Sequence, residues 1–174
     1  MMIKGSRKYN YHYNSQCKCP EIGEMINGQA VGDISKIRYG SFYMSFNGCE
    51  VIAVHNALIH INKPKSIVEI AFYMERFKVL FGLFGCNVYK IGRALEYFEI
   101  KFRRVKKLDD IKSFIVSFWN GRPLMSSIHT VFCIRTEKGI EIYNRYNNCP
   151  DIRCYETIDD IIGKRKMIVA YEIL

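Results

Sequence analysis

The chain has 174 residues, a length that fits one domain with a sizeable core. Hydrophobic residues make up 49% of it and charged residues 25%, and twelve Tyr with eleven Phe argue against disorder. The formal net charge of +9 would attract acidic partners. However, the basic residues form only short runs, at 101–107 and 164–166, and no nucleic-acid-binding motif accompanies them. We therefore expect a solvated basic face and no nucleic-acid partner.

The N-terminus and the cysteines bear on location. Residues 1–8 are followed by no apolar run, so we expect neither a signal peptide nor a membrane segment. We therefore expect the protein to be cytoplasmic. Seven scattered cysteines, an odd number, fit reduced thiols better than a disulfide framework. Cys17, Cys19, Cys149 and Cys154 supply four soft ligands for zinc, but without the usual spacing, and we expect no metal.

The first forty residues give weak signals. Residues 1–20 are rich in Tyr, Asn and Lys without a clear period, which predicts an extended arm. A glycine-containing loop follows Pro20, and apolar residues between 34 and 42 indicate a short approach to the next segment, with a strand in it. We assign residues 1–40 to an N-terminal arm and loop.

The stretch Asn47-Gly48-Cys49 places a cysteine where a loop turns into an apolar helix. Apolar residues recur near helical spacing from Val51 to Ile61, which predicts a helix buried along one stripe. Asn47 is placed to cap this helix, and Gly48 allows a substrate to approach the backbone. Because a helix N-terminus offers unpaired N–H groups and the positive end of the dipole, we expect the pKa of the Cys49 thiol to be lowered.

Three more helices are expected before residue 120. Ser66 and Glu69 form a capping-box pattern that opens a helix reaching about residue 77. Asn87 is placed to cap a helix over 88–98. After a short strand at 102–105, amphipathic spacing predicts a helix over 108–119, and Asn-Gly-Arg-Pro at 120–123 stops it. Residues 41–120 form the expected helical half of the domain.

Strands are expected to dominate residues 121–174. Segments 123–127, 129–136 and 139–144 are rich in β-formers, and residues 137–139 make a hairpin turn. A short helix over 157–162 and a closing strand over 167–173 complete the chain. Helices first and an antiparallel sheet second is the α+β pattern, with residues 1–174 as one domain.

His129 opens one strand of the predicted hairpin, and Asn144 closes the next. A hairpin places the start of one strand beside the end of the other, so these two residues are expected to meet. A cysteine nucleophile needs an imidazole to take its proton and a further group to orient that imidazole. Alternatively, Cys49 packs as a small hydrophobe, His129 is a strand-end residue satisfied by water, and Asn144 is a turn residue.

Taken together, these features resemble the papain-like cysteine peptidases: Cys49 at a helix start, a Gly85-Cys86-Asn87 turn that opens a further helix, His129, and Tyr143-Asn144. Within that group, the chain is most similar to the bacteriocin-processing peptidases that cleave after double-glycine leaders, over residues 40–150 and by pattern. The resemblance implies a papain-like fold with Cys49 as nucleophile, His129 as general base and later acid, and Asn144 as the orienting residue. It further implies hydrolysis or transfer at an acyl centre, no cofactor, and a peptide or protein substrate.

The sequence departs from the family at the oxyanion hole. Tyr43 stands six residues ahead of Cys49, where the family carries a glutamine donor. Loss of one such donor typically costs about a hundred- to a thousandfold in rate. Asn47, the Tyr43 hydroxyl and the Cys49 main-chain N–H are the candidate replacements. A catalytically degenerate peptide-binding module on the same fold is therefore the alternative function. The remaining histidines, at 12, 55 and 60, are poorer candidates for the base.

Overall fold

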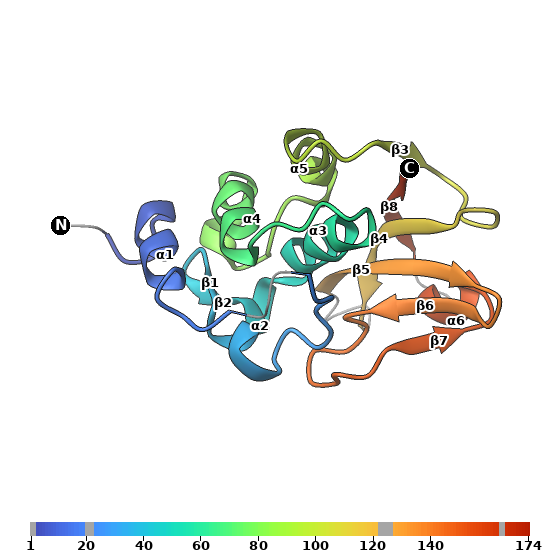
Figure 1. Ribbon diagram of the computed structural model, residues 1–174, viewed down its shortest axis with the longest axis horizontal. Helices are drawn as coiled ribbons and strands as arrows, with labels where there is room; N and C mark the ends of the chain where they lie inside the picture. Colours follow the sequence, from blue (N-terminus) through green and yellow to red (C-terminus); the bar gives the residue numbers. More distant parts are fainter. Residues whose placement is uncertain (1–2, 20–22, 122–126, 164–165) are drawn as a thin grey trace.

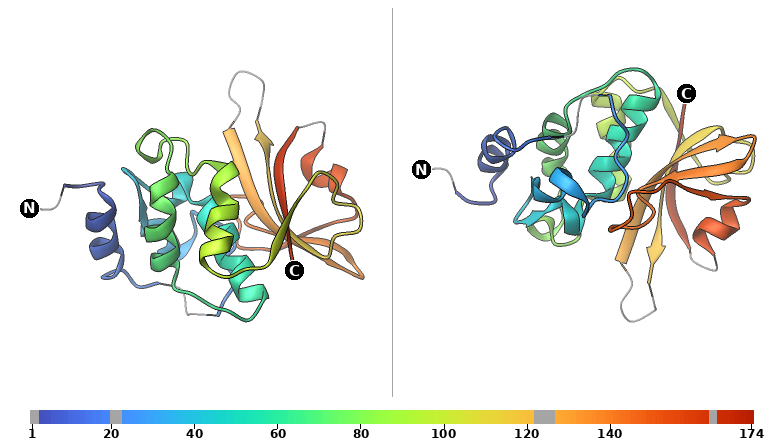
Figure 2. Two further views of the ribbon diagram at one scale, coloured as in Figure 1. Left: turned by 90° about the horizontal axis from the view of Figure 1, so that it is seen from above. Right: turned by 60° about the horizontal axis from the view of Figure 1, so that its bottom comes forward.

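The computed structural model describes residues 3–19, 23–121, 127–163 and 166–174. Helices from the first part of the chain pack beside a twisted sheet from the second part (Figure 1). The views in Figure 2 place α3 between α4 and the sheet, and α6 on the far side of the sheet. The molecule is thus mixed α+β, as predicted, with α1 to α5 on one side of an antiparallel sheet and α6 on the other.

In the described part of the chain, the α-helices have these bounds: α1 Arg7–Asn14, α2 Met44–Asn47, α3 Cys49–His60, α4 Ile67–Met74, α5 Ile91–Tyr97 and α6 Ile158–Ile162. Short 3-10 turns occupy Gly32–Lys36, Glu75–Phe77, Leu80–Gly82 and Val88–Lys90. Among the described residues, no helix combines the length and apolar character needed to cross a membrane.

The large sheet has six strands in the order β3-β8-β4-β5-β6-β7, and every neighbouring pair is antiparallel. A separate two-stranded hairpin, β1 with β2, precedes α2. The bounds are β1 Arg38–Tyr39, β2 Phe42–Tyr43, β3 Phe102–Val105, β4 Ser113–Asn120, β5 Ser127–Thr136, β6 Gly139–Tyr143, β7 Arg153–Tyr155 and β8 Met167–Ile173.

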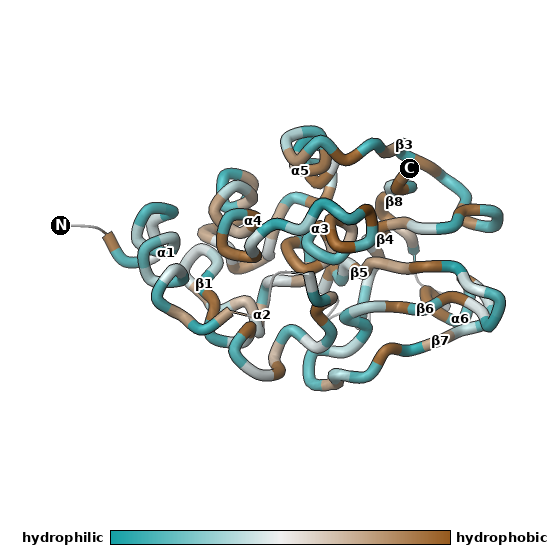
Figure 3. The backbone as a smooth tube through the Cα atoms, in the orientation of Figure 1, coloured by the Kyte–Doolittle hydropathy of each residue, from teal (hydrophilic) through white to brown (hydrophobic). Residues whose placement is uncertain are grey.

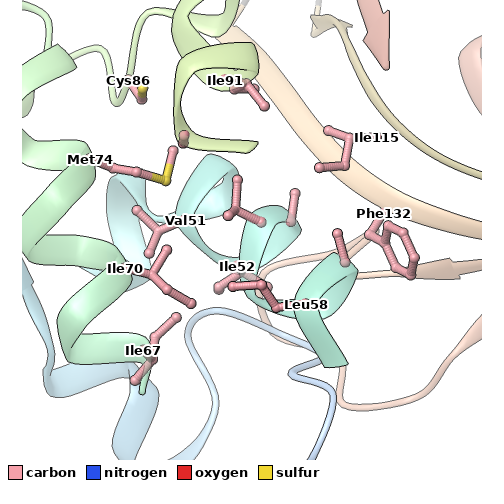
Figure 4. Packing of buried hydrophobic residues seen from close by; sticks show 14 of the residues in the cluster. Val51, Ile52, Leu58, Ile67, Ile70, Met74, Cys86, Ile91, Ile115 and Phe132 are labelled. Atoms are coloured by element: carbon pink, nitrogen blue, oxygen red, sulfur yellow. The ribbon is translucent and has the colours of Figure 1, made fainter. Parts of the chain in front are cut away.

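Both faces of the sheet are covered, which creates two hydrophobic clusters. The larger cluster joins α3, α4 and α5 to inward-facing residues such as Ile115 of β4 and Phe132 of β5 (Figure 4). The smaller lies on the other face, where Ile161 and Ile162 of α6 pack on neighbours of these residues in β4 and β5. Figure 3 shows α1 as largely hydrophilic, whereas α3 to α5 carry long hydrophobic stretches. The core therefore centres on α3.

Most predicted elements are confirmed. The helix that begins at Cys49 is α3, and the Ser66 side chain accepts a hydrogen bond from Val68 N at the start of α4. Asn87 likewise caps the turn that leads into α5. The predicted strand at 167–173 is β8, and α6 carries a capping box between Thr157 and Asp160.

Two predicted elements are wrong, and one lies partly outside the described residues. The predicted helix over 108–119 is instead β4, which is paired with β5 and β8, so its apolar residues are buried on two faces. The N-terminal arm is not extended throughout, because Arg7–Asn14 forms α1. The predicted strand at 123–127 falls outside the described residues except for Ser127, which begins β5.

Candidate functional site

The tight junction between α2 and α3 puts Cys49 at the first position of a twelve-residue helix. Gly48 separates the two helices, and a Cβ atom there would lie 2.7 Å from the Met44 Cβ. The junction therefore requires glycine for packing. Cys49 begins α3 as predicted, but the N-cap position belongs to Gly48 and carries no side-chain cap.

Asn47 does not cap α3, contrary to the prediction, because it is the last residue of α2. Its Nδ2 donates to the carbonyls of Tyr39 and Gly82, so the side chain ties the β1–β2 hairpin and the 80–82 turn to the helix junction. Both amide hydrogens are used in these two bonds. Asn47 is thus committed to structure and has no donor left for an oxyanion.

The Cys49 thiol is buried, with 6% of the residue exposed, and lies between Glu50 and β5. Burial raises the pKa of the thiol well above its ordinary value, and the neighbouring Glu50 charge adds to the increase. The Thr130 main-chain N–H lies against the sulfur and acts in the opposite direction. The expected net lowering of this pKa at the helix start is therefore wrong, and the resting thiol is protonated at neutral pH.

Glu50 is a buried carboxyl group beside the thiol, and sequence reasoning did not single it out. It is 2% exposed, and its Oε2 lacks a hydrogen-bond partner among the described residues. The carboxylate faces the Cα of Gly85, where an added Cβ would lie 2.9 Å from Oε2. Desolvation raises the pKa of Glu50 to about 7, although its own main-chain N–H, the Cys49 thiol and the Cys86 main-chain N–H stabilise the charge by hydrogen bonding.

His129 lies near the start of β5, one residue before the Thr130 amide that meets the thiol. Its Nε2 is 2.7 Å from the main-chain oxygen of Asn144, and its ring meets Phe118 edge-on at 6.0 Å. Phe118 belongs to the sheet face covered by α6, whereas α3 brings Cys49 to β5 from the other face. The site is therefore built around the beginning of β5, with the cysteine and the histidine reaching it from different faces.

Asn144 meets His129 as predicted, but through its backbone. Its side chain is paired with Gln29: Oδ1 accepts from Gln29 N at 2.9 Å, and Nδ2 donates to Gln29 Oε1 at 3.1 Å. The residue adopts a left-handed conformation, with φ of 61°. Sequence reasoning missed Gln29, because no local pattern links two residues 115 positions apart.

Tyr43, the other candidate oxyanion donor, lies at the surface of β2 and is 43% exposed. Its hydroxyl accepts from Arg38 Nη1 at 3.4 Å and also bonds with Tyr13. The Arg38 guanidinium lies 4.9 Å from the centre of the Tyr43 ring. The described contacts of this side chain therefore serve the hairpin and α1.

The other candidate ligands and bases have structural roles. His55 lies 3.0 Å from the Glu24 carbonyl, His60 packs on Phe132, and His12 contacts Gln16. All seven cysteines carry free thiols. Within the described ranges, no three His, Cys, Asp or Glu side chains gather as a metal site would require. A surface pocket of about 440 Å³ lies over α1, α4 and α5, and its lining does not include the site residues.

Comparison of the chain with protein-family models, with curated proteins and with solved structures found no match.

Proposed function

We propose that the protein is a papain-like thiol peptidase, or a related acyl hydrolase or transferase, with Cys49 as nucleophile and His129 as base. The observation that carries the proposal is the meeting of α3 and β5, where the Cys49 sulfur lies against the Thr130 amide next to His129. A cysteine at a helix start beside a histidine-bearing strand is the arrangement that nucleophilic thiol chemistry uses. The substrate class is a peptide or protein, and no cofactor takes part.

In the proposed reaction, the Cys49 sulfur attacks a substrate carbonyl carbon while the thiol proton passes to His129, a transfer that requires the imidazole to reach the sheet face on which the thiol lies. The tetrahedral intermediate collapses, the acyl bond to the leaving group breaks, and the imidazolium returns the proton to that leaving group. Water or another nucleophile, deprotonated by His129, then attacks the thioester and releases the acyl group and the thiol. Because burial keeps the resting thiol protonated, proton transfer accompanies the attack on the substrate.

The oxyanion of this intermediate needs donors other than Asn47 and Tyr43, whose polar groups are engaged elsewhere. We assign this role to the main-chain N–H of Cys49, which belongs to the first turn of α3. A first-turn N–H has no partner within its own helix and points toward the incoming chain end. A single main-chain donor would make this a slow enzyme compared with one that has a complete oxyanion hole.

A peptide acyloxymethyl ketone, which traps a nucleophilic thiol after binding as a substrate would, tests the proposal. We expect one covalent adduct on Cys49, detected by intact-protein mass spectrometry and peptide mapping. Cys49→Ala should abolish it, and His129→Ala should slow labelling by about a hundredfold, the usual contribution of a general base. Cys86→Ala is the matched control, since Cys86 is also buried at a turn beside Glu50. An adduct that persists in Cys49→Ala would exclude Cys49 as the nucleophile.

A catalytically degenerate peptide-binding module on the same fold is the second candidate. The burial of Cys49 and the carboxyl group beside it favour this alternative, since both oppose formation of a thiolate. The position of His129 on the sheet face opposite α3 favours it as well. A binding module would leave Cys49 unlabelled by the ketone at neutral pH and would bind the parent peptide equally well before and after Cys49→Ala. An enzyme would hydrolyse or transfer that peptide, and only the unmodified chain would do so.

A further inference from the structure

We infer that Gln29 is a positioning residue of the candidate site: it holds Asn144 in the conformation from which the Asn144 carbonyl fixes His129. That this positioning serves catalysis rests on the proposed function. The hydrogen bonds that link Gln29, Asn144 and His129 are present in the structure without a substrate.

Gln29 is 2% exposed and bridges two elements that are distant in sequence. Its main-chain N–H and its side-chain oxygen bond the two ends of the Asn144 amide, at 2.9 and 3.1 Å. Its remaining donor, Nε2, bonds the Ser45 carbonyl in α2 at 3.2 Å. Gln29 therefore links the helix junction that carries Cys49 to the residue that contacts His129.

The flanking residues hold Gln29 in this bridge. Ile26 exchanges two hydrogen bonds with the Asn56 side chain of α3, at 2.8 and 2.9 Å. Asn27 accepts from the Asn144 main-chain N–H, and Ala30 N donates to the Asn147 carbonyl at 2.8 Å. This segment is thus fastened to α3 on one side and to the chain after β6 on the other.

The left-handed backbone of Asn144 determines where its carbonyl points. Left-handed conformations are costly for most L-residues, and asparagine tolerates them better than others. The two bonds from Gln29 hold the side chain of this strained residue. The carbonyl then lies 2.7 Å from His129 Nε2.

A carbonyl oxygen only accepts hydrogen bonds, so this contact requires the proton on Nε2. The neutral imidazole then has its basic lone pair on Nδ1. Nδ1 is therefore the basic nitrogen of the ring. In this way a buried glutamine selects the histidine tautomer through an intervening main-chain group.

Nitrogen-15 spectra of the histidine rings, recorded at neutral pH on the full chain, test this without relying on activity. The His129 signals are assigned by their loss in His129→Ala. We expect the wild-type ring in the Nε2–H form. Gln29→Met, which fills similar space without polar atoms in its side chain, should give a mixture of both tautomers. It should also slow labelling of Cys49 by the ketone by about tenfold, which is a modest part of the effect of losing a general base. Gln29→Glu, which keeps an acceptor for Asn144 Nδ2, should restore the wild-type spectrum.

Gln16→Ala is the matched control, because Gln16 is the only other glutamine in the chain and is exposed. If a Gln29 variant fails to fold, the His129 spectrum of Asn144→Gly tests the inference instead. Glycine accepts the left-handed backbone but removes both side-chain hydrogen bonds to Gln29. A wild-type His129 spectrum in Gln29→Met or Asn144→Gly, or an Nδ1–H form in the wild type, would overturn the inference. A tautomer that depends on Gln29 in a chain that never labels at Cys49 would instead count against the proposed function alone.

Discussion

A cysteine and a glutamate next to each other at the start of α3 set the chemistry of the site at the scale of single residues. Glu50 has little solvent to stabilise its charge, and its Oε2 lacks a partner in the described structure. An ionised carboxylate there opposes ionisation of Cys49, since two like charges would share one buried region. The protonation state of Glu50 therefore affects both the stability of the fold and the reactivity of the thiol.

Glu50→Gln should remove a specific loss of stability with rising pH. The pKa of Glu50 is about 7 in the folded chain against an ordinary 4.5, so the folded state keeps a proton that the unfolded state releases. Stability from this proton is fully present below about pH 4.5 and falls as pH rises to about 7, by roughly 3 kcal/mol in all. Urea unfolding at several pH values measures this loss as the difference in the free energy of unfolding between the wild type and Glu50→Gln.

Glu96→Gln on the exposed face of α5 is the control for that measurement, because it makes the same chemical change at a carboxyl group that lies in solvent. If Glu50→Gln and wild type lose stability in parallel between pH 4.5 and 7, Glu50 ionises normally in the folded chain.

How far the sequence predicts the site differs from residue to residue. Cys49 at a helix start and Asn144 beside His129 follow from local patterns, because caps and hairpins are determined by near neighbours. The raised pKa of Cys49 cannot be predicted from local patterns, because the burial of the thiol depends on the packing of β5 against α3. Asn47 fails as a cap because tertiary contacts with Tyr39 and Gly82 take its side chain.

The two wrong elements have different physical causes. In β4, Phe114, Ile115 and Phe118 are spaced as on a helix face, but a strand covered on both faces also reads as a continuous apolar run. In α1, the buried residues are Asn10 and Asn14, so no apolar stripe marks the helix. The buried contacts of α1 are the hydrogen bonds of these two asparagines, and such bonds leave no hydrophobic period in the sequence.

Asn14→Ala tests this polar docking of α1. Asn14 Nδ2 donates to the Arg38 carbonyl at 2.9 Å, and Arg38 N donates to Asn14 Oδ1 at 2.8 Å, as a strand partner would. Alanine leaves both main-chain groups of β1 without this partner, and we expect a loss of about 2 kcal/mol in the free energy of unfolding. Urea unfolding measures this loss. Faster amide hydrogen exchange confined to α1 would show that the destabilised region is this helix.

Asn148→Ala is the matched control, since Asn148 is exposed in the loop after β6. Equal stability of the two variants would mean that the Asn14 bonds are replaced by water at no cost, and that α1 is held by other contacts.

At the scale of the whole molecule, α3 joins the helices to the sheet. The larger hydrophobic cluster includes Ile52 and Leu58 of α3, Ile70 of α4, and Ile115 and Phe132 of the sheet, so neither side can lose its contacts alone (Figure 4). The sheet also takes β3 and β4 from before residue 121 and β5 to β8 from after it. A division into a helical and a sheet half therefore describes the chain order better than the packing.

The chain should consequently unfold as one cooperative unit. Trp119, the only tryptophan, lies in β4 and reports on the sheet by fluorescence, while far-ultraviolet circular dichroism reports mainly on the helices. We expect the two urea transitions to coincide. Ile52→Val, which removes a fully buried methylene from α3, should shift both midpoints together by the equivalent of about 1 kcal/mol. Leu174→Ala, at a position 63% exposed, should shift neither. A shift of the dichroism midpoint without a matching change at Trp119 would show that the helices and the sheet fold separately, and that the site at their junction assembles only after both have formed.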